Sequence, residues 1–214
     1  MTSSIQALLD IVLPRKERLV RAEHYVAEDL PILPTEHEAC GVSVTTLLSY
    51  RNPAVEDCIR AVKYDDSVHA AELLAEALSE YLREEIAQIH SFSSKPVLLV
   101  PVPLHPLRHH ERGFNQIERV LARLPTEFHD GTLARLSTDA LVRVRPTAQP
   151  THLTRAERLL TMKGAFAVHH IDAVLYAHVI LIDDVVTTGA TLAEAVRPLL
   201  NLEVAVDAIA LARA

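Results

Sequence analysis

Two adjacent carboxylates followed by a loop of hydroxyl residues form the part of this sequence best suited to chemistry. Asp183 and Asp184 follow the apolar run 179–182. Small and hydroxyl residues come soon after them: Thr187, Thr188, Gly189, Ala190 and Thr191. Residues 192–200 then have a helical pattern. Free backbone N–H groups, hydroxyls and a helix N-terminus at one point favour a phosphate monoester as the ligand.

The carboxylates narrow the class of ligand further. They would repel a phosphate unless they bind hydroxyl groups, or Mg²⁺ shared with ligand oxygens. A sugar phosphate supplies both the hydroxyl groups and the phosphate oxygens that would share Mg²⁺. The alternative is a buried strand that ends in a solvated Asp-Asp turn, but such a turn does not need the strand, acids, hydroxyl loop and helix in this order.

The elements that would position these residues are those of a parallel sheet. The short β-branched run 179–182 predicts a strand that is buried on both faces and stops at Asp183. Ligands of open α/β sheets bind beyond the carboxyl ends of such strands. A second apolar strand is predicted at 96–103, and the residues between it and the helix from 117 onwards include Arg112, Gly113, Asn115 and Gln116. Gly113 predicts a tight turn and Asn115 a helix cap, which gives a second anion-binding corner.

The loop 143–155 is polar and contains three arginines and two prolines. Its candidate ligand contacts are Arg145, Thr147 and Gln149. Both a lid over the site and an ordinary surface loop fit this composition. Residues 105–158 as a whole carry nine arginines, no lysine and six acids. This basic island suggests a phosphorylated ligand, although part of it also fits plain helix surface.

Composition sets the outer limits. The chain has 214 residues, a net charge of −7 and a mean hydropathy of +0.15, which indicate a globular protein that is not coated for non-specific nucleic-acid binding. No apolar run is long enough for a membrane span, so we expect a cytoplasmic protein. Cys40 and Cys58 are too few for a disulfide framework or a four-thiolate zinc site, and the 12 histidines are scattered.

The N-terminal part is expected to be a small appendage. Residues 4–12 predict a short amphipathic helix, and the charged, proline-containing stretch 15–37 predicts a linker or irregular wrap. We therefore divide the chain into residues 1–41, the appendage, and residues 42–214, the main α/β domain. The main domain is expected to open with a strand at 42–50, followed by helices ending near Lys63 and Glu85.

Together these motifs resemble the type I phosphoribosyltransferases, and more closely the competence protein F (ComF) family within that fold. The family's motifs run from about residue 42 to the C-terminus. They match Tyr50-Arg51-Asn52-Pro53, Lys63-Tyr64, Pro101-Val102-Pro103, Arg112 to Gln116, Arg145 to Gln149, Arg158, Gly164-Ala165-Phe166 and Asp183 to Gly189. Many members carry a cysteine-rich zinc knuckle near the N-terminus, and this sequence lacks those cysteines.

The resemblance implies a mostly parallel sheet flanked by helices and a pentosyltransferase that uses phosphoribosyl diphosphate (PRPP). It assigns Asp183 and Asp184 to the ribose hydroxyls, to an oxocarbenium-like transition state and, indirectly, to Mg²⁺ as cofactor. It assigns the loop amides to the 5′-phosphate. Some purine-specific members have a carboxylate base at the position of Thr187, which weakens a purine-salvage assignment here. The acceptor is not identified.

Two other classes stay open. One is a regulator that binds PRPP without turnover, and the other is an accessory protein of DNA uptake, with DNA-uptake proteins as partners. A homodimer is a further candidate assembly.

Overall fold

The computed structural model describes residues 17–104, 113–144 and 163–214, and every structural statement below concerns these ranges. Its main element is a six-stranded sheet of order β1-β2-β8-β7-β3-β4. The strands are β1 (Thr35–Ala39), β2 (Val42–Ser49), β3 (Val97–Pro101), β4 (Ala134–Leu136), β7 (His178–Val186) and β8 (Ala205–Arg213). Edge strand β1 is antiparallel to β2, and all other pairings are parallel. The predicted mostly parallel sheet is confirmed.

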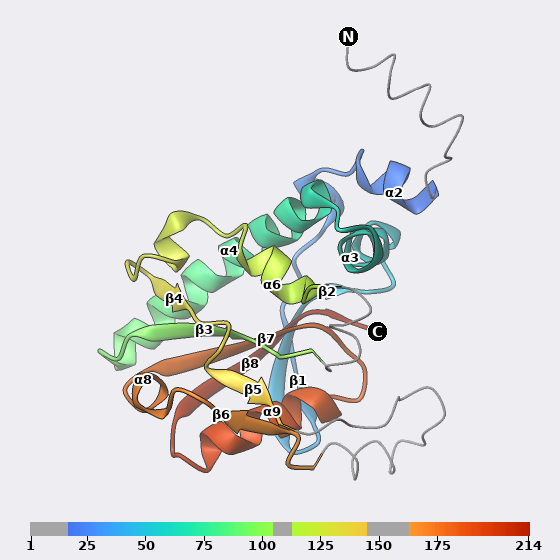
Figure 1. Ribbon diagram of the computed structural model, residues 1–214. Helices are drawn as coiled ribbons and strands as arrows, with labels where there is room; N and C mark the ends of the chain where they lie inside the picture. Colours follow the sequence, from blue (N-terminus) through green and yellow to red (C-terminus); the bar gives the residue numbers. More distant parts are fainter. Residues whose placement is uncertain (1–16, 105–112, 145–162) are drawn as a thin grey trace.

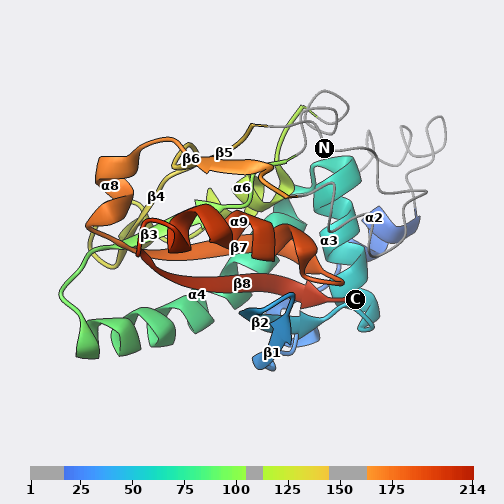
Figure 2. The same ribbon diagram turned by 90° about the horizontal axis from the view of Figure 1, so that it is seen from below.

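Helices cover both faces of this sheet (Figure 1). On one face lie α3 (Pro53–Asp65), α4 (Val68–Phe92) and α6 (Gln116–Leu121). On the other lie α8 (Ile171–Leu175), α9 (Ala190–Leu200) and the hairpin of β5 (Leu141–Arg143) and β6 (Phe166–Val168). Figure 2 shows α9 running along β7 and β8. A short 3-10 helix, η2 (Thr126–Phe128), precedes β4.

The strands are buried because both of their faces are covered. In β7, Ile180 and Ile182 pack into the cluster beneath α3, α4 and α6, whereas Val179 and Leu181 pack into the cluster beneath α9. This alternation is the two-residue period of a strand. The prediction that the strand stops at Asp183 was wrong: β7 continues to Val186, because β8 pairs with it along this length.

The N-terminal region is more ordered than its composition indicated. It contains α2 (Glu17–Ala22), the 3-10 helix η1 (Ala27–Asp29) and β1, where a linker or irregular wrap was expected. Ala22 and Leu30 are buried in the core, and β1 pairs with β2 along its whole length. These contacts attach residues 17–39 closely to the rest of the chain. The helix expected at 4–12 lies outside the described residues.

Two helices that reach the site have caps that fix where they begin. Asn52 accepts the N–H of Ala54 at 2.8 Å and Pro53 follows it, so α3 starts there and places Lys63 in its last turn. Asn115 accepts the N–H of Ile117 at 3.2 Å, which confirms the predicted cap of α6. Among the described residues, no helix combines the length and apolar character needed to cross a membrane.

Candidate functional site

The acidic pair lies near the carboxyl end of β7, between strands β3 and β8. The backbone N–H of Val102 donates to Ile182 O at 2.8 Å, so the end of β3 flanks the pair. Asp183 is paired with Ala210 of β8, which belongs to the cluster on the α9 face. Asp184 instead contacts residues of α3 and α6. The two carboxylates therefore leave the strand toward opposite faces of the sheet.

Asp184 is buried and well supplied with donors. Its Oδ2 accepts from Gln116 Nε2 at 2.8 Å and lies 3.9 Å from Lys63 Nζ. Its Oδ1 accepts the N–H of Val185 at 2.7 Å. A buried carboxylate needs such partners to remain charged, and here they come from two helices and the strand itself.

Asp183 has a different environment. Its side chain is partly buried, and Oδ1 accepts the N–H of Asp184 at 2.9 Å. Burial, together with the adjacent charge of Asp184, raises the pKa of the Asp183 carboxyl well above its usual value. Within the described ranges no cation forms an ion pair with Asp183. A ligand that brings hydroxyl donors or a cation would offset this unfavourable charge.

The hydroxyl loop joins β7 to the N-terminus of α9. Gly189 is the N-cap residue, with a φ of +75°, and offers no side chain to cap the helix. The Ala190 N–H makes only a long hydrogen bond to Thr188 Oγ1, at 3.5 Å, so an anion in the loop can accept from the first-turn N–H groups of α9. Thr187 is exposed and Thr188 is partly buried. These features fit the predicted phosphate site.

The turn between β1 and β2 supports this loop from the other side. A Cβ at Gly189 would collide with Ala39 Cβ, so the close approach as well as the positive φ requires glycine. The Cys40 thiol donates to Thr188 O at 3.3 Å. Sequence reasoning missed this support, because nothing in one sequence relates residue 39 to residue 189. Cys40 is partly buried and Cys58 is buried, and both are free thiols.

The second predicted corner meets the first through one side chain. Asn115 is buried, caps α6 and donates to Val102 O at 3.0 Å, which ties the helix start to the end of β3. Gln116, the next residue, makes the hydrogen bond to Asp184. Gly113 has a φ of +77°, as a tight turn requires. Asn115 thus has a structural role here, and direct ligand contacts of Gly113, Asn115 and Gln116 stay predictions.

Four predicted ligand contacts lie outside the described residues: Arg112, Arg145, Thr147 and Gln149. Their roles, and the lid, stay predictions. Of the predicted lid, only Arg143 and Val144 are described, and the Val144 N–H donates to Ala165 O at 2.8 Å. The next described segment begins at residue 163, where the Gly164 N–H donates to Glu194 of α9 at 3.2 Å. In the basic island, Arg119 pairs with Asp66 and Arg123 with Glu72, as ordinary helix-surface arginines do.

Lys63 is the site residue that sequence reasoning did not assign. Lys63-Tyr64 entered only as part of the family resemblance, without a role. In the structure Lys63 reaches the acidic pair from α3, and its Nζ lies 5.8 Å from the centroid of the half-exposed Tyr64 ring. Tyr50, between β2 and α3, also senses the acidic pair: burial is the main cause that raises its pKa, and the charges of Glu56 and Asp184 raise it further. No signal in one sequence relates α3 to β7 beyond the motif match.

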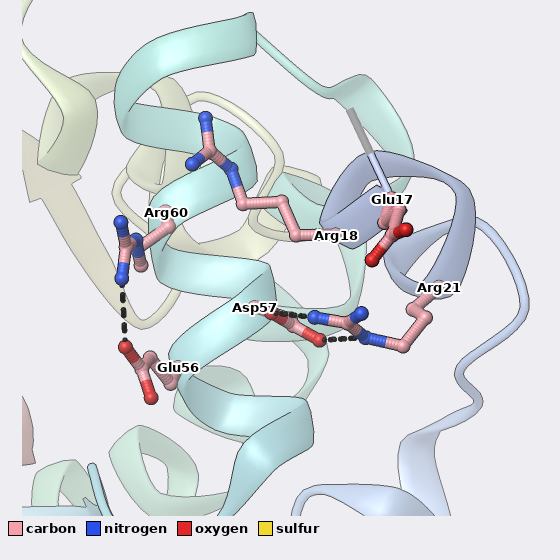
Figure 3. A pocket seen from close by; sticks show the side chains of 6 residues that line it. All are labelled: Glu17, Arg18, Arg21, Glu56, Asp57 and Arg60. Atoms are coloured by element: carbon pink, nitrogen blue, oxygen red, sulfur yellow. Dashed lines mark hydrogen bonds and ion pairs between the residues drawn. The ribbon is translucent and has the colours of Figure 1, made fainter. Parts of the chain in front are cut away.

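A separate pocket of about 350 Å³ lies between α2 and α3 (Figure 3). It is lined by three acids and three arginines: Glu17, Arg18, Arg21, Glu56, Asp57 and Arg60. Each arginine is already paired, Arg18 with Asp65, Arg21 with Asp57 and Arg60 with Glu56. We therefore place the candidate functional site at the acidic pair and its loop, not in this pocket.

The side chains available at the site decide whether it could hold the expected Mg²⁺. In the described part of the chain, no group of three or more His, Cys, Asp or Glu residues could hold a metal ion. Mg²⁺ is commonly held by one or two carboxylates together with substrate phosphates and water. The oxygens of Asp183 and Asp184 fit that arrangement, in which the ligand supplies most of the coordination.

Comparison with known proteins gives a consistent set of relatives, although no protein-family model matches the chain. It is 34% identical over 130 residues to the DNA utilization protein YhgH of Escherichia coli K12, covering 60% of this chain and 55% of that protein. It is 29% identical over 155 residues to the competence protein ComFC of Streptococcus pneumoniae R6, covering 72% and 60%. It is 32% identical over 100 residues to the competence protein F of Haemophilus influenzae, covering 46% and 42%. The chain spans little more than half the length of the first of these relatives.

Proposed function

We propose that this chain, a member of the competence protein F family by its similarity to these relatives, binds PRPP and transfers its ribose 5-phosphate to an acceptor. The observation that carries the proposal is the succession, within one β7–α9 connection, of two carboxylates, a hydroxyl loop and an uncapped helix N-terminus. A phosphate and a set of ribose hydroxyls, joined in one molecule, match these two neighbouring groups of donors and acceptors.

Each part of the site has a chemical task in this proposal. The N–H groups around Gly189 bind the 5′-phosphate, and the acidic pair accepts hydrogen bonds from the ribose hydroxyls. Breaking the bond between the anomeric carbon and diphosphate leaves positive charge on the ribose, which nearby carboxylates stabilise. The bonding electron pair leaves with diphosphate, and the acceptor forms the new bond. Mg²⁺, held indirectly by Asp183 and Asp184 through ligand or water oxygens, would supply neutralising charge for the diphosphate.

Isothermal titration calorimetry with PRPP and Mg²⁺ tests this directly. The wild-type chain should bind, and the Asp183→Asn/Asp184→Asn double variant should lose at least about tenfold in affinity, which is about 1.4 kcal/mol. Asp172→Asn, an exposed aspartate at the start of α8, is the matched control and should bind as the wild type does. Equal affinity of the double variant and the control would refute the assignment.

A role in handling DNA is the second candidate, favoured by the names of the relatives. In this role the chain contacts single-stranded DNA directly. Titration of a fluorescent single-stranded oligonucleotide at low and high salt separates the candidates. DNA binding that weakens with salt would support this role, since released counterions drive such binding. Absence of binding at low salt would count against a direct contact with DNA.

A further inference from the structure

The two carboxylates of the candidate site are held very differently. Both oxygens of Asp184 have partners, and those partners come from α3, α6 and β7. Asp183 accepts only the N–H of its neighbour among the contacts described for it. Asp184 is therefore fixed before any ligand arrives, whereas Asp183 keeps acceptor capacity for one.

Helix α3 places Lys63 beside the Asp184 carboxylate. The caps at Asn52 and Asp66 fix where α3 begins and ends, and the Lys63 side chain in its last turn is only 21% exposed. Its ammonium group lies 3.9 Å from Asp184 Oδ2, which is an ion-pair distance rather than a hydrogen bond. The Asp184 side chain is 12% exposed, so solvent screens this attraction less than at an open surface.

Gln116 reaches the same oxygen independently, from α6 at 2.8 Å. A neutral amide orients the carboxylate but leaves its charge uncompensated. The ammonium of Lys63 supplies that compensation from a different helix. Removal of Lys63 should therefore leave the hydrogen bond in place while making the charged carboxylate less favourable where it lies.

We propose that Lys63 is a positioning residue of this site, which together with Gln116 holds the Asp184 carboxylate in place before the ligand binds, while Asp183 keeps the larger acceptor capacity for that ligand. This inference rests on the proposed function for its binding assay, because PRPP with Mg²⁺ is the probe.

The test is a double-mutant cycle between Lys63→Met and Asp184→Asn, read as affinity for Mg²⁺-PRPP. Lys63→Met should weaken binding by roughly 5–10-fold in the wild-type background, and by less than about twofold once Asp184 is Asn, because a positioning effect disappears with its target. Lys63→Arg keeps the positive charge and should recover most of the affinity. Lys95→Met, at an exposed lysine before β3, is the control and should change nothing.

The same cycle is measured without ligand by urea unfolding, which also shows whether the variants are folded. The effects of Lys63→Met and Asp184→Asn on the free energy of unfolding should be non-additive if the two side chains interact. Additive effects would overturn the inference even where binding is too weak to measure.

The outcomes separate the inference from the function on which it rests. If the wild type does not bind Mg²⁺-PRPP, the proposed function fails and this inference falls with it. If the wild type binds and Lys63→Met binds equally well, the inference alone is wrong. A loss that persists undiminished in the Asp184→Asn background would show that Lys63 contacts the ligand itself, which also contradicts a positioning role.

Discussion

Gly189 is the residue on which the geometry of the hydroxyl loop depends most. Its φ of +75° disfavours any side chain, and Ala39 occupies the place where a Cβ would be. Gly113 has almost the same φ, +77°, but nothing lies within 4 Å of the place where its Cβ would be. Comparing substitutions at Gly113 and Gly189 therefore separates the cost of backbone strain from the cost of a steric collision.

We predict that Gly113→Ala lowers the free energy of unfolding by about 1 kcal/mol, through backbone strain alone. Gly189→Ala should cost more, by roughly a further 1–3 kcal/mol, because the new methyl group must displace Ala39. Urea unfolding of both variants gives the comparison. Adding Ala39→Gly to Gly189→Ala should recover the steric part only. Equal losses at the two glycines would contradict the close approach of the β1–β2 turn to the loop.

Single residues also show how far sequence reasoning reaches at the site. The acidic pair, the loop and the cap at Asn115 follow local patterns, and the structure puts all of them at one edge of the sheet. Ala39, Cys40 and Lys63 could not be predicted in the same way. They reach the site through tertiary contacts between distant segments, and such contacts leave no local period or spacing.

At the scale of elements, β7 and α2 show why some boundaries were missed. β7 continues past its apolar run because β8 offers a partner as far as Val186, so pairing outweighs the local polarity of two aspartates. Helix α2 is short and charged, and its contacts with α3 hold it in place. Arg18 pairs with Asp65, and Arg21 pairs with Asp57 through two hydrogen bonds. Composition alone favoured a linker there.

The attachment of α2 to α3 gives a prediction about pH. The Arg21 guanidinium, with the Tyr25 hydroxyl, holds the pKa of the Asp57 carboxyl below its usual value. Because the folded state lowers this pKa, the unfolded state binds more protons in acid. The stabilisation is therefore present above the unfolded pKa, near about 4, and is lost as the pH falls through the lower folded pKa.

Asp57→Asn should accordingly lower the free energy of unfolding at pH 7, and the difference from the wild type should shrink as the pH falls below about 4. Urea unfolding between pH 3 and pH 7, taken as roughly one pH unit per step, measures this. Asp172→Asn, at an exposed position, serves as the control. A difference that does not depend on pH would mean that Asp57 acts through packing rather than charge.

At the scale of the whole molecule, the sheet brings together segments that are far apart in the chain. The site combines the β1–β2 turn, the last turn of α3, the start of α6 and the β7–α9 connection (Figure 1). A mostly parallel sheet makes this possible because the carboxyl ends of its strands lie along one edge. The fold class was predictable because buried parallel strands leave continuous apolar runs, as at 97–101 and 179–182.

The most direct test of the proposed function is a crystal structure of the protein soaked with PRPP and Mg²⁺. We expect the 5′-phosphate at the N–H groups around Gly189 and the start of α9, with ribose hydroxyls on Asp183 and Asp184. Lys63 should remain beside Asp184. A phosphate bound instead among Arg18, Arg21 and Arg60 of the α2–α3 pocket, with the acidic pair making no ligand contact, would contradict the proposal.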